Sequence, residues 1–274
     1  MKKLAGKVAY VTGSGRGIGR EVAMKLASEG ARLVVNDLDQ EPADEVVALI
    51  RNAGGEAIAV VGSVTDEDFG DRFINTGIEA FGGVDIIVNN AGYTWDSMIH
   101  KMSDDQFDAM IDVHLKAPWK VLKAAAGFIR NAAAEEAAEG REVIRKVVNI
   151  SSVAGTGGNI GQSNYSSAKS GVLGLTKSLA KEWGRLKVNV NCVAFGIIAT
   201  RLTEASDEKK TITVEGNEVS IGIPSKVHQG FTRLIPMGRA GTAQEAAGGV
   251  YLFCTPESDY ISGQTIIVGG GFAM

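Results

Sequence analysis

Three polar side chains in the second half of the chain have the types and spacing of an acid/base site. Ser152 follows an apolar run, and Tyr165 and Lys169 open and close the segment Tyr-Ser-Ser-Ala-Lys that begins 13 residues later. Residues four apart lie on one face of a helix, so the Lys169 ammonium would stand beside the Tyr165 phenol. At about 4 Å and an effective dielectric of about 20, this charge is worth about 4 kcal/mol and would bring the phenol pKa from about 10 towards about 7. Tyr165 could then exchange a proton with a substrate oxygen that the Ser152 hydroxyl binds.

A Tyr-x3-Lys pair alone is usually a surface feature. Its place after an apolar strand, with Ser152 upstream, favours the site in this chain.

A glycine-rich turn near the N-terminus has the composition of a phosphate-binding loop. It joins a predicted strand to a predicted helix and consists of Thr12, Gly13, Ser14, Gly15, Arg16, Gly17, Ile18 and Gly19. Glycines let the backbone approach a pyrophosphate closely, and a helix N-terminus offers free N–H groups. The Gly-x3-Gly-x-Gly spacing differs from the usual dinucleotide fingerprint, so a plain tight turn stays the alternative.

Asp37 strengthens the case for a dinucleotide, because it ends the second predicted strand 18 residues after Gly19. Its carboxylate could accept hydrogen bonds from the adenosine ribose and would repel the 2′-phosphate of NADP. The alternative role is capping of the next helix. Arg16 could instead meet that phosphate, but like-charge repulsion from Asp37 is the more direct effect. We therefore expect NAD, and less readily NADP, as the cofactor.

The elements that must position these groups alternate along the chain. Apolar runs predict strands at 8–12, 32–36, 57–61, 84–89, 146–150, 188–193 and 265–268, and helical periodicity covers 17–28, 43–53, 66–81, 104–130, 164–185 and 243–253. Continuously apolar strands between helices are typical of a parallel sheet covered on both faces. We predict one α/β domain over residues 1–274, a Rossmann-type doubly wound parallel sheet of about seven strands, with ligands at the carboxyl ends of the strands.

Two segments interrupt this alternation. Residues 131–146 are rich in Ala and Glu and are interpreted as a surface insertion that prolongs the preceding helix up to a turn at Gly140. The segment 201–239 is long, polar and irregular, with a turn at 215–218, and is interpreted as a substrate lid.

Composition excludes several classes of protein. A formal net charge of −4 gives no reason to expect nucleic acid or an anionic membrane as a partner. The chain has two cysteines and three histidines without metal-ligand spacing, so we expect no disulfide framework and no metal. It has neither the apolar core of a signal peptide nor an apolar run of about 18 residues, and a cytoplasmic location is expected.

With these residues in place, the chain resembles the short-chain dehydrogenase/reductase family from residue 7 to residue 271. The matching motifs are the glycine-rich turn, the Asn-Asn-Ala-Gly element at Asn89, Asn90, Ala91 and Gly92, and the trio Ser152, Tyr165 and Lys169. The resemblance implies that Ser152 orients the substrate oxygen and that Tyr165 exchanges the proton. It also implies that Lys169 binds the nicotinamide ribose and lowers the pKa of Tyr165, so that both residues belong to the cofactor site as well.

Within the family, segments 94–107 and 235–239 are most similar to β-ketoacyl carrier-protein reductases and hydroxyacyl-CoA dehydrogenases. The expected reaction is therefore the NAD-dependent interconversion of a secondary alcohol and a ketone in a 3-hydroxyacyl or 3-oxoacyl thioester. The alternatives are a cyclic alcohol, steroid or sugar as the substrate, and an inactive NAD-binding subunit. The resemblance also implies a homotetramer built through helices 104–130 and 164–185 and the C-terminus.

Four positions depart from the family pattern. His114 stands where the family has a proton-relay Asn, and imidazole can also hold a relay water, although a buried structural histidine is the alternative. Ser63 replaces an aspartate that contacts adenine, beside Val64, which should still line the adenine pocket. Phe195 replaces a proline, while Ile198 and Thr200 match the family's carboxamide and phosphate contacts. The fourth departure is the long lid.

Overall fold

A computed structural model describes residues 2–201, 203–208 and 210–272. Its centre is a seven-stranded sheet in the order β3-β2-β1-β4-β5-β6-β9, in which every neighbouring pair is parallel. The strands are β1 (Val8–Val11), β2 (Arg32–Asp37), β3 (Ala57–Val61), β4 (Ile86–Asn89), β5 (Arg145–Ser152), β6 (Val188–Phe195) and β9 (Thr265–Val268). The strand order runs outwards in both directions from β1 and β4, which confirms the predicted doubly wound sheet.

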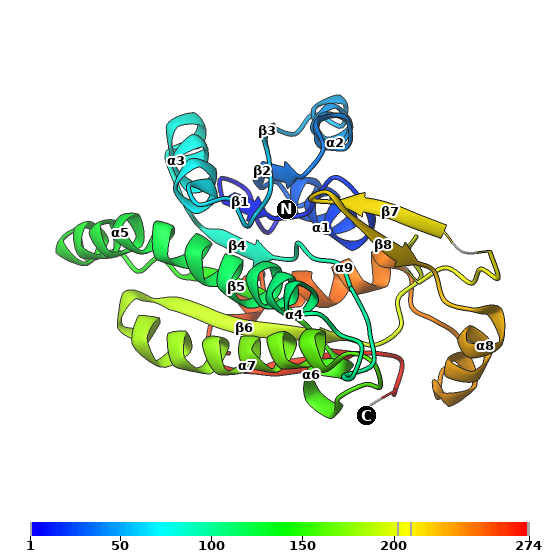
Figure 1. Ribbon diagram of the computed structural model, residues 1–274. Helices are drawn as coiled ribbons and strands as arrows, with labels where there is room; N and C mark the ends of the chain where they lie inside the picture. Colours follow the sequence, from blue (N-terminus) through cyan, green and yellow to red (C-terminus); the bar gives the residue numbers. More distant parts are fainter. Residues whose placement is uncertain (1, 202, 209, 273–274) are drawn as a thin grey trace.

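Helices cover both faces of this sheet (Figure 1). One apolar layer forms under α1 (Gly17–Ser28), α2 (Gln40–Asn52) and α9 (Ala243–Leu252). The opposite layer forms under α3 (Phe69–Phe81), α5 (Ala117–Ala138) and α7 (Ser163–Trp183). Strands such as β1 and β4 are buried along their whole length because apolar side chains meet a helix layer on either side. Two short 3₁₀ turns occupy Gly184–Leu186 and Pro256–Ser258.

The predicted helix at 104–130 consists of three consecutive parts. It starts as α4 (Asp104–Ile111), widens into a π-helical turn at Asp112–Lys116, and continues as α5 to Ala138. A capping box formed by Ser103 and Gln106 fixes its first turn. The π-helical turn carries His114, and such turns are frequently found at functional sites.

The Ala/Glu-rich segment prolongs α5 and turns at Gly140, where φ is +69°. Its exposed part ends earlier than residue 146, because β5 begins at Arg145. Arg145 and Lys146 are buried, so the prediction of a surface insertion was wrong at this end. Glu136 of α5 holds the Arg145 guanidinium through two contacts of 2.6 and 2.9 Å, which fastens the helix to the start of the strand.

The segment after β6 is more regular than predicted. It forms an antiparallel hairpin of β7 (Lys210–Val214) and β8 (Asn217–Ile221), followed by helix α8 (Ser225–Leu234). The predicted turn is present at Glu215 and Gly216. Figure 1 shows this turn reaching back towards β1, β2 and β3, with α8 on its far side. The prediction missed the hairpin because each of its strands is only five residues long.

No helix within the described residues is long and apolar enough to cross a membrane.

Candidate active site

The structure brings Ser152, Tyr165 and Lys169 together at the carboxyl end of β5. Ser152 is the last residue of β5 and caps α6 (Val153–Gly157), because its Oγ accepts a 3.1 Å hydrogen bond from the Ala154 N–H. Tyr165 and Lys169 lie on the first turns of α7. The Lys169 Nζ donates to the Ile150 carbonyl at 2.7 Å and lies 5.7 Å from the centre of the Tyr165 ring.

The ionisation of Tyr165 differs from the sequence-based expectation. Burial raises the pKa of its phenol to about 12, which a hydrogen bond with Ser152 opposes and the charge of Asp96 reinforces. The expectation of a phenol near neutrality was wrong for this structure because it ignored desolvation. Burial also lowers the pKa of Lys169 to about 8, so its ammonium is itself costly to keep in this site.

His114 lies against the ring of Tyr165, with ring centres 4.9 Å apart and planes at 90°. Its Nε2 is 2.6 Å from the Tyr93 carbonyl, which makes Nε2 the protonated nitrogen. Nδ1 is buried and has no hydrogen-bond partner among the described residues. Burial, and then the charge of Lys169, hold the pKa of His114 well below its usual range. His114 therefore offers a neutral acceptor beside the tyrosine.

The start of α7 is fastened by residues that the sequence analysis did not single out. Buried Asn164 donates from Nδ2 to the carbonyls of Trp95 and Gln106, at 3.0 and 2.9 Å. Gln162 donates to Asp96 at 2.8 Å. These contacts fix the helix that carries Tyr165 to the loop after β4 and to α4. The sequence signal that could have found them is the presence of two amide side chains, Gln162 and Asn164, just before Tyr165.

The glycine-rich turn fits the pyrophosphate of a dinucleotide. Arg16 is the N-cap residue of α1 and makes no side-chain cap, and the first turn carries no acidic residue, so its N–H groups can receive an anion. Gly17 has φ of +54°, and a Cβ on it would meet nothing closer than the Thr200 Cγ2 at 3.8 Å. The space beside Gly17 is open up to Thr200, whereas Gly13, Gly15 and Gly19 are packed against neighbouring atoms.

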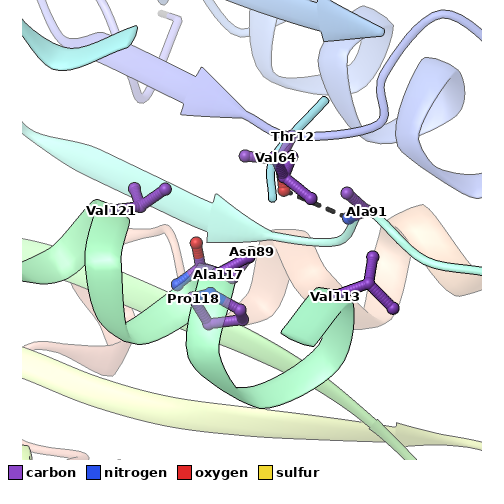
Figure 2. A pocket seen from close by; sticks show the side chains of 8 residues that line it. All are labelled: Thr12, Val64, Asn89, Ala91, Val113, Ala117, Pro118 and Val121. Atoms are coloured by element: carbon purple, nitrogen blue, oxygen red, sulfur yellow. Dashed lines mark hydrogen bonds between the residues drawn. The ribbon is translucent and has the colours of Figure 1, made fainter. Parts of the chain in front are cut away.

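The Asn-Asn-Ala-Gly element is tied to this turn. The Thr12 Oγ1 accepts from the N–H groups of Asn90 and Ala91 at 3.0 and 3.1 Å, and the Asn90 side chain donates to the Gly13 carbonyl. Figure 2 shows Thr12 bonded to Ala91 within a small pocket that Val64 and Val113 also line. Gly92 packs so closely on His114 that a Cβ on it would lie 2.1 Å from the imidazole Cε1. Apolar groups thus surround the ends of β3 and β4.

Asp37 lies at the end of β2, as predicted, and is already bound within the protein. Its Oδ2 accepts from the Gly15 N–H at 3.1 Å, and its Oδ1 lies 3.2 Å from the Arg16 guanidinium. Asp39 also holds Arg16, at 2.8 Å. Two carboxylates therefore neutralise the one basic side chain of the glycine-rich turn.

The described residues contain no group of three or more His, Cys, Asp or Glu side chains that could hold a metal ion.

Comparisons with known proteins agree with this arrangement. A family model described as short chain dehydrogenase matches residues 7–211. A 3-oxoacyl-[acyl-carrier-protein] reductase of Synechocystis is 38% identical over 276 aligned residues, which cover the whole of both chains. Reductases of the same name from Thermotoga maritima and Staphylococcus aureus are 32% and 36% identical, over 99% and 98% of this chain and 100% and 98% of theirs. The resemblance seen in the sequence is confirmed, and the chain belongs to the short-chain dehydrogenase family of oxidoreductases.

Proposed function

We propose that this chain is an NAD-dependent oxidoreductase that interconverts a secondary alcohol and a ketone, with 3-oxoacyl and 3-hydroxyacyl thioesters as its substrates. The observation that carries the proposal is the gathering of Ser152, Tyr165 and Lys169 on the sheet edge that also holds the glycine-rich turn. The substrate class is supported by the names of the relatives from Synechocystis, Thermotoga maritima and Staphylococcus aureus.

Each member of the trio has a separate task in this proposal. The Ser152 Oγ accepts from the Ala154 N–H, and its own proton, which it shares with Tyr165 in this structure, can be donated to a substrate oxygen that lies between them. With a pKa of about 12, Tyr165 is protonated at neutral pH and can give its proton to the oxygen as negative charge develops there. Lys169 stabilises the phenolate left behind and holds the ribose beside it. The nicotinamide, when bound, supplies the hydride for the carbon, and alcohol oxidation reverses these transfers.

His114 is proposed as the proton relay behind Tyr165. Its Nδ1 can accept a hydrogen bond from a water molecule, because Nε2 already donates to the Tyr93 carbonyl. The ring contact with Tyr165 would keep such a water close to the phenol.

The remaining cofactor contacts follow the sheet edge. The pyrophosphate would lie over residues 13–19, the adenosine against Asp37, Ser63, Val64, Asn90, Ala91 and Gly92, and the nicotinamide end near Ile198, Thr200, Tyr165 and Lys169. NAD is favoured over NADP because Asp37 would repel a 2′-phosphate and because Arg16 is engaged by Asp37 and Asp39.

Exposed apolar side chains support a homotetramer. Phe107 of α4 and Trp119 of α5 are 39% and 47% exposed, and Tyr260 and Ile261 near the C-terminus are exposed as well. These are two of the regions expected to meet another subunit. Light scattering of the purified chain would give the mass of a tetramer, and a cytoplasmic location is the setting that we propose for it.

The function is tested by following NADH absorbance with a panel of 3-oxoacyl thioesters, cyclic ketones, steroids and sugars. We expect turnover with the thioesters at a kcat/KM about tenfold or more above that of the other classes, and NADH preferred to NADPH. Faster turnover of a cyclic ketone, steroid or sugar would show that this class, and not the thioesters, is the substrate. An NADPH preference of about tenfold would contradict the role given to Asp37. NADH binding without turnover of any substrate would indicate an inactive subunit.

A further inference from the structure

The turn of the β7–β8 hairpin places a carboxylate at the end of β3. The Glu215 Oε1 accepts a 2.7 Å hydrogen bond from the Thr65 Oγ1 and a second, short one from the Ser63 Oγ. The two hydroxyls also lie 2.7 Å from each other, so they form one small network under the carboxylate. Among the described residues, the Glu215 Oε2 has no hydrogen-bond partner.

Burial of an apolar side chain supports this position of the hairpin. Val219 of β8 is only 1% exposed, although most of its neighbours on the hairpin face solvent, and it belongs to the same apolar cluster as Val64 and Tyr93. The charge of Glu215 adds to the burial that raises the pKa of Tyr93 to about 12. Val219 and Glu215 thus connect the hairpin with the ends of β3 and β4.

Glu215 is an unfavourable residue for its backbone conformation. It has φ of +49° and Gly216 has φ of +81°, the two positive values of a two-residue hairpin turn. Asn, Asp and Gly are favoured at the first of these positions, and a longer side chain costs more there. Strained residues concentrate at functional sites, so the choice of Glu points to a role for its side chain.

A dinucleotide bound as proposed above would have its base close to this carboxylate. With the pyrophosphate at the N-terminus of α1 and the ribose at Asp37, the base must lie over the ends of β3 and β4. The side chains of Val64, Ala91 and Val113 lie together there around a cavity of about 10 Å³, which is too small for a base, so a flat ring would lie against the outside of this apolar group (Figure 2). Ser63 and Thr65 flank Val64 in the sequence, so Glu215 lies at the rim of that surface.

We propose that the β7–β8 hairpin is a lid over the adenine of the cofactor and that the Glu215 carboxylate accepts a hydrogen bond from the adenine 6-amino group. A carboxylate accepts hydrogen bonds only, so it favours an amino group at this position and disfavours a carbonyl. The lid segment then determines the choice of nucleotide as well as covering the substrate. This inference rests on the proposed function, because it requires a dinucleotide in the site.

The test compares NADH with its hypoxanthine analogue, in which a carbonyl replaces the 6-amino group, by calorimetric titration of the full chain. A hydrogen bond to a charged group predicts that the wild type binds NADH about tenfold more tightly than the analogue. Glu215→Gln, which keeps the size and removes the charge, should reduce this ratio to below about twofold. Glu218→Gln removes the same charge from an exposed position on the same hairpin and should leave the ratio at about tenfold.

An unchanged ratio in Glu215→Gln would overturn the proposal. So would tighter NADH binding after residues 210–221 are replaced by a short Gly-Ser linker, because the hairpin would then exclude the nucleotide instead of holding it. Wild-type turnover of NADH with a 3-oxoacyl thioester, combined with either result, would leave the proposed function intact. Absence of NADH binding by the wild type would contradict both.

Discussion

Two buried lysines contact the same strand at opposite ends and have very different surroundings. Lys146, at the start of β5, lies 2.7 Å from the Asp259 carboxylate and donates to the side chains of Asn189 and Ser258. Lys169, at the carboxyl end, donates only to the carbonyl of Ile150 among the described residues. Both side chains are about equally buried, at 4% exposure for each residue.

The difference separates structural charge from reactive charge. A buried ammonium with a carboxylate and further acceptors is neutralised where it stands, and it serves the packing of the sheet. A buried ammonium with a single carbonyl keeps a strong field, which can act on a neighbouring phenol. The amino edge of the sheet is thus held by ion pairs, to which Glu136 and Arg145 add another, and the carboxyl edge is where we propose that the reaction takes place.

Replacing each lysine by Met would sharpen this comparison, and the largest effect is expected for Lys169. Lys169→Met should lower kcat by about 10³-fold, because the phenolate of Tyr165 loses the charge that stabilises it. Lys146→Met should keep the kcat of the folded fraction within about twofold. The check is steady-state kinetics normalised to the folded fraction. Equal losses in both variants would remove the distinction between the two edges.

The free energy of unfolding should fall more in Lys146→Met than in Lys169→Met, which is the reverse of the order expected for kcat. Lys146→Met leaves Asn189, Ser258 and Asp259 without the ammonium they share, so the free energy of unfolding should fall by about 2 kcal/mol. Lys169→Met removes a charge whose burial is unfavourable and should cost less than this, or raise stability. Urea denaturation at neutral pH compares the two variants, and a larger loss in Lys169→Met would be the contrary result.

The pH dependence of stability gives the smallest effect and isolates Lys169. Burial lowers the pKa of Lys169 to about 8, below its value in the unfolded chain. Above pH 8 the folded state releases this proton while the unfolded state keeps it, so stability rises with pH in this window. Between about pH 7 and about pH 9, the wild type should gain about 1 kcal/mol relative to Lys169→Met. Burial raises the pKa of Cys192 to about 11, and loss of the Lys169 charge would raise it further, so the folded thiol stays protonated over this range in both proteins. If the difference in the free energy of unfolding between the wild type and Lys169→Met stayed constant across this range, the lowered pKa of Lys169 would be contradicted.

Much of this architecture was predictable because it depends on local patterns. Apolar runs gave all seven strands of the sheet, and the spacing of Tyr165 and Lys169 placed both on one helix face. Contacts between distant segments were not predictable in this way. Asn164 binds the Trp95 carbonyl, and Glu215 meets Ser63, only because the chain folds back on itself.

The pKa of Tyr165 was wrongly predicted for a related reason. Spacing indicates which charge is near, but desolvation depends on all the segments that cover the ring, including the π-helical turn at His114. The hairpin was missed because each of its strands is only five residues long, although apolar and polar residues alternate along both. Val219 is buried, and Ile212 and Val214 pack against the same apolar cluster.

The proposed reaction depends on the Tyr165 hydroxyl as the group that exchanges the proton with the substrate, and Tyr165→Phe removes that hydroxyl alone. Turnover of a 3-oxoacyl thioester and NADH binding by titration would be measured on the same preparation of this variant. The account predicts a fall in kcat of about 10³-fold or more, with the NADH dissociation constant within about threefold of the wild type. A variant that turns over at the wild-type rate would show that another group transfers the proton, and the account would be wrong.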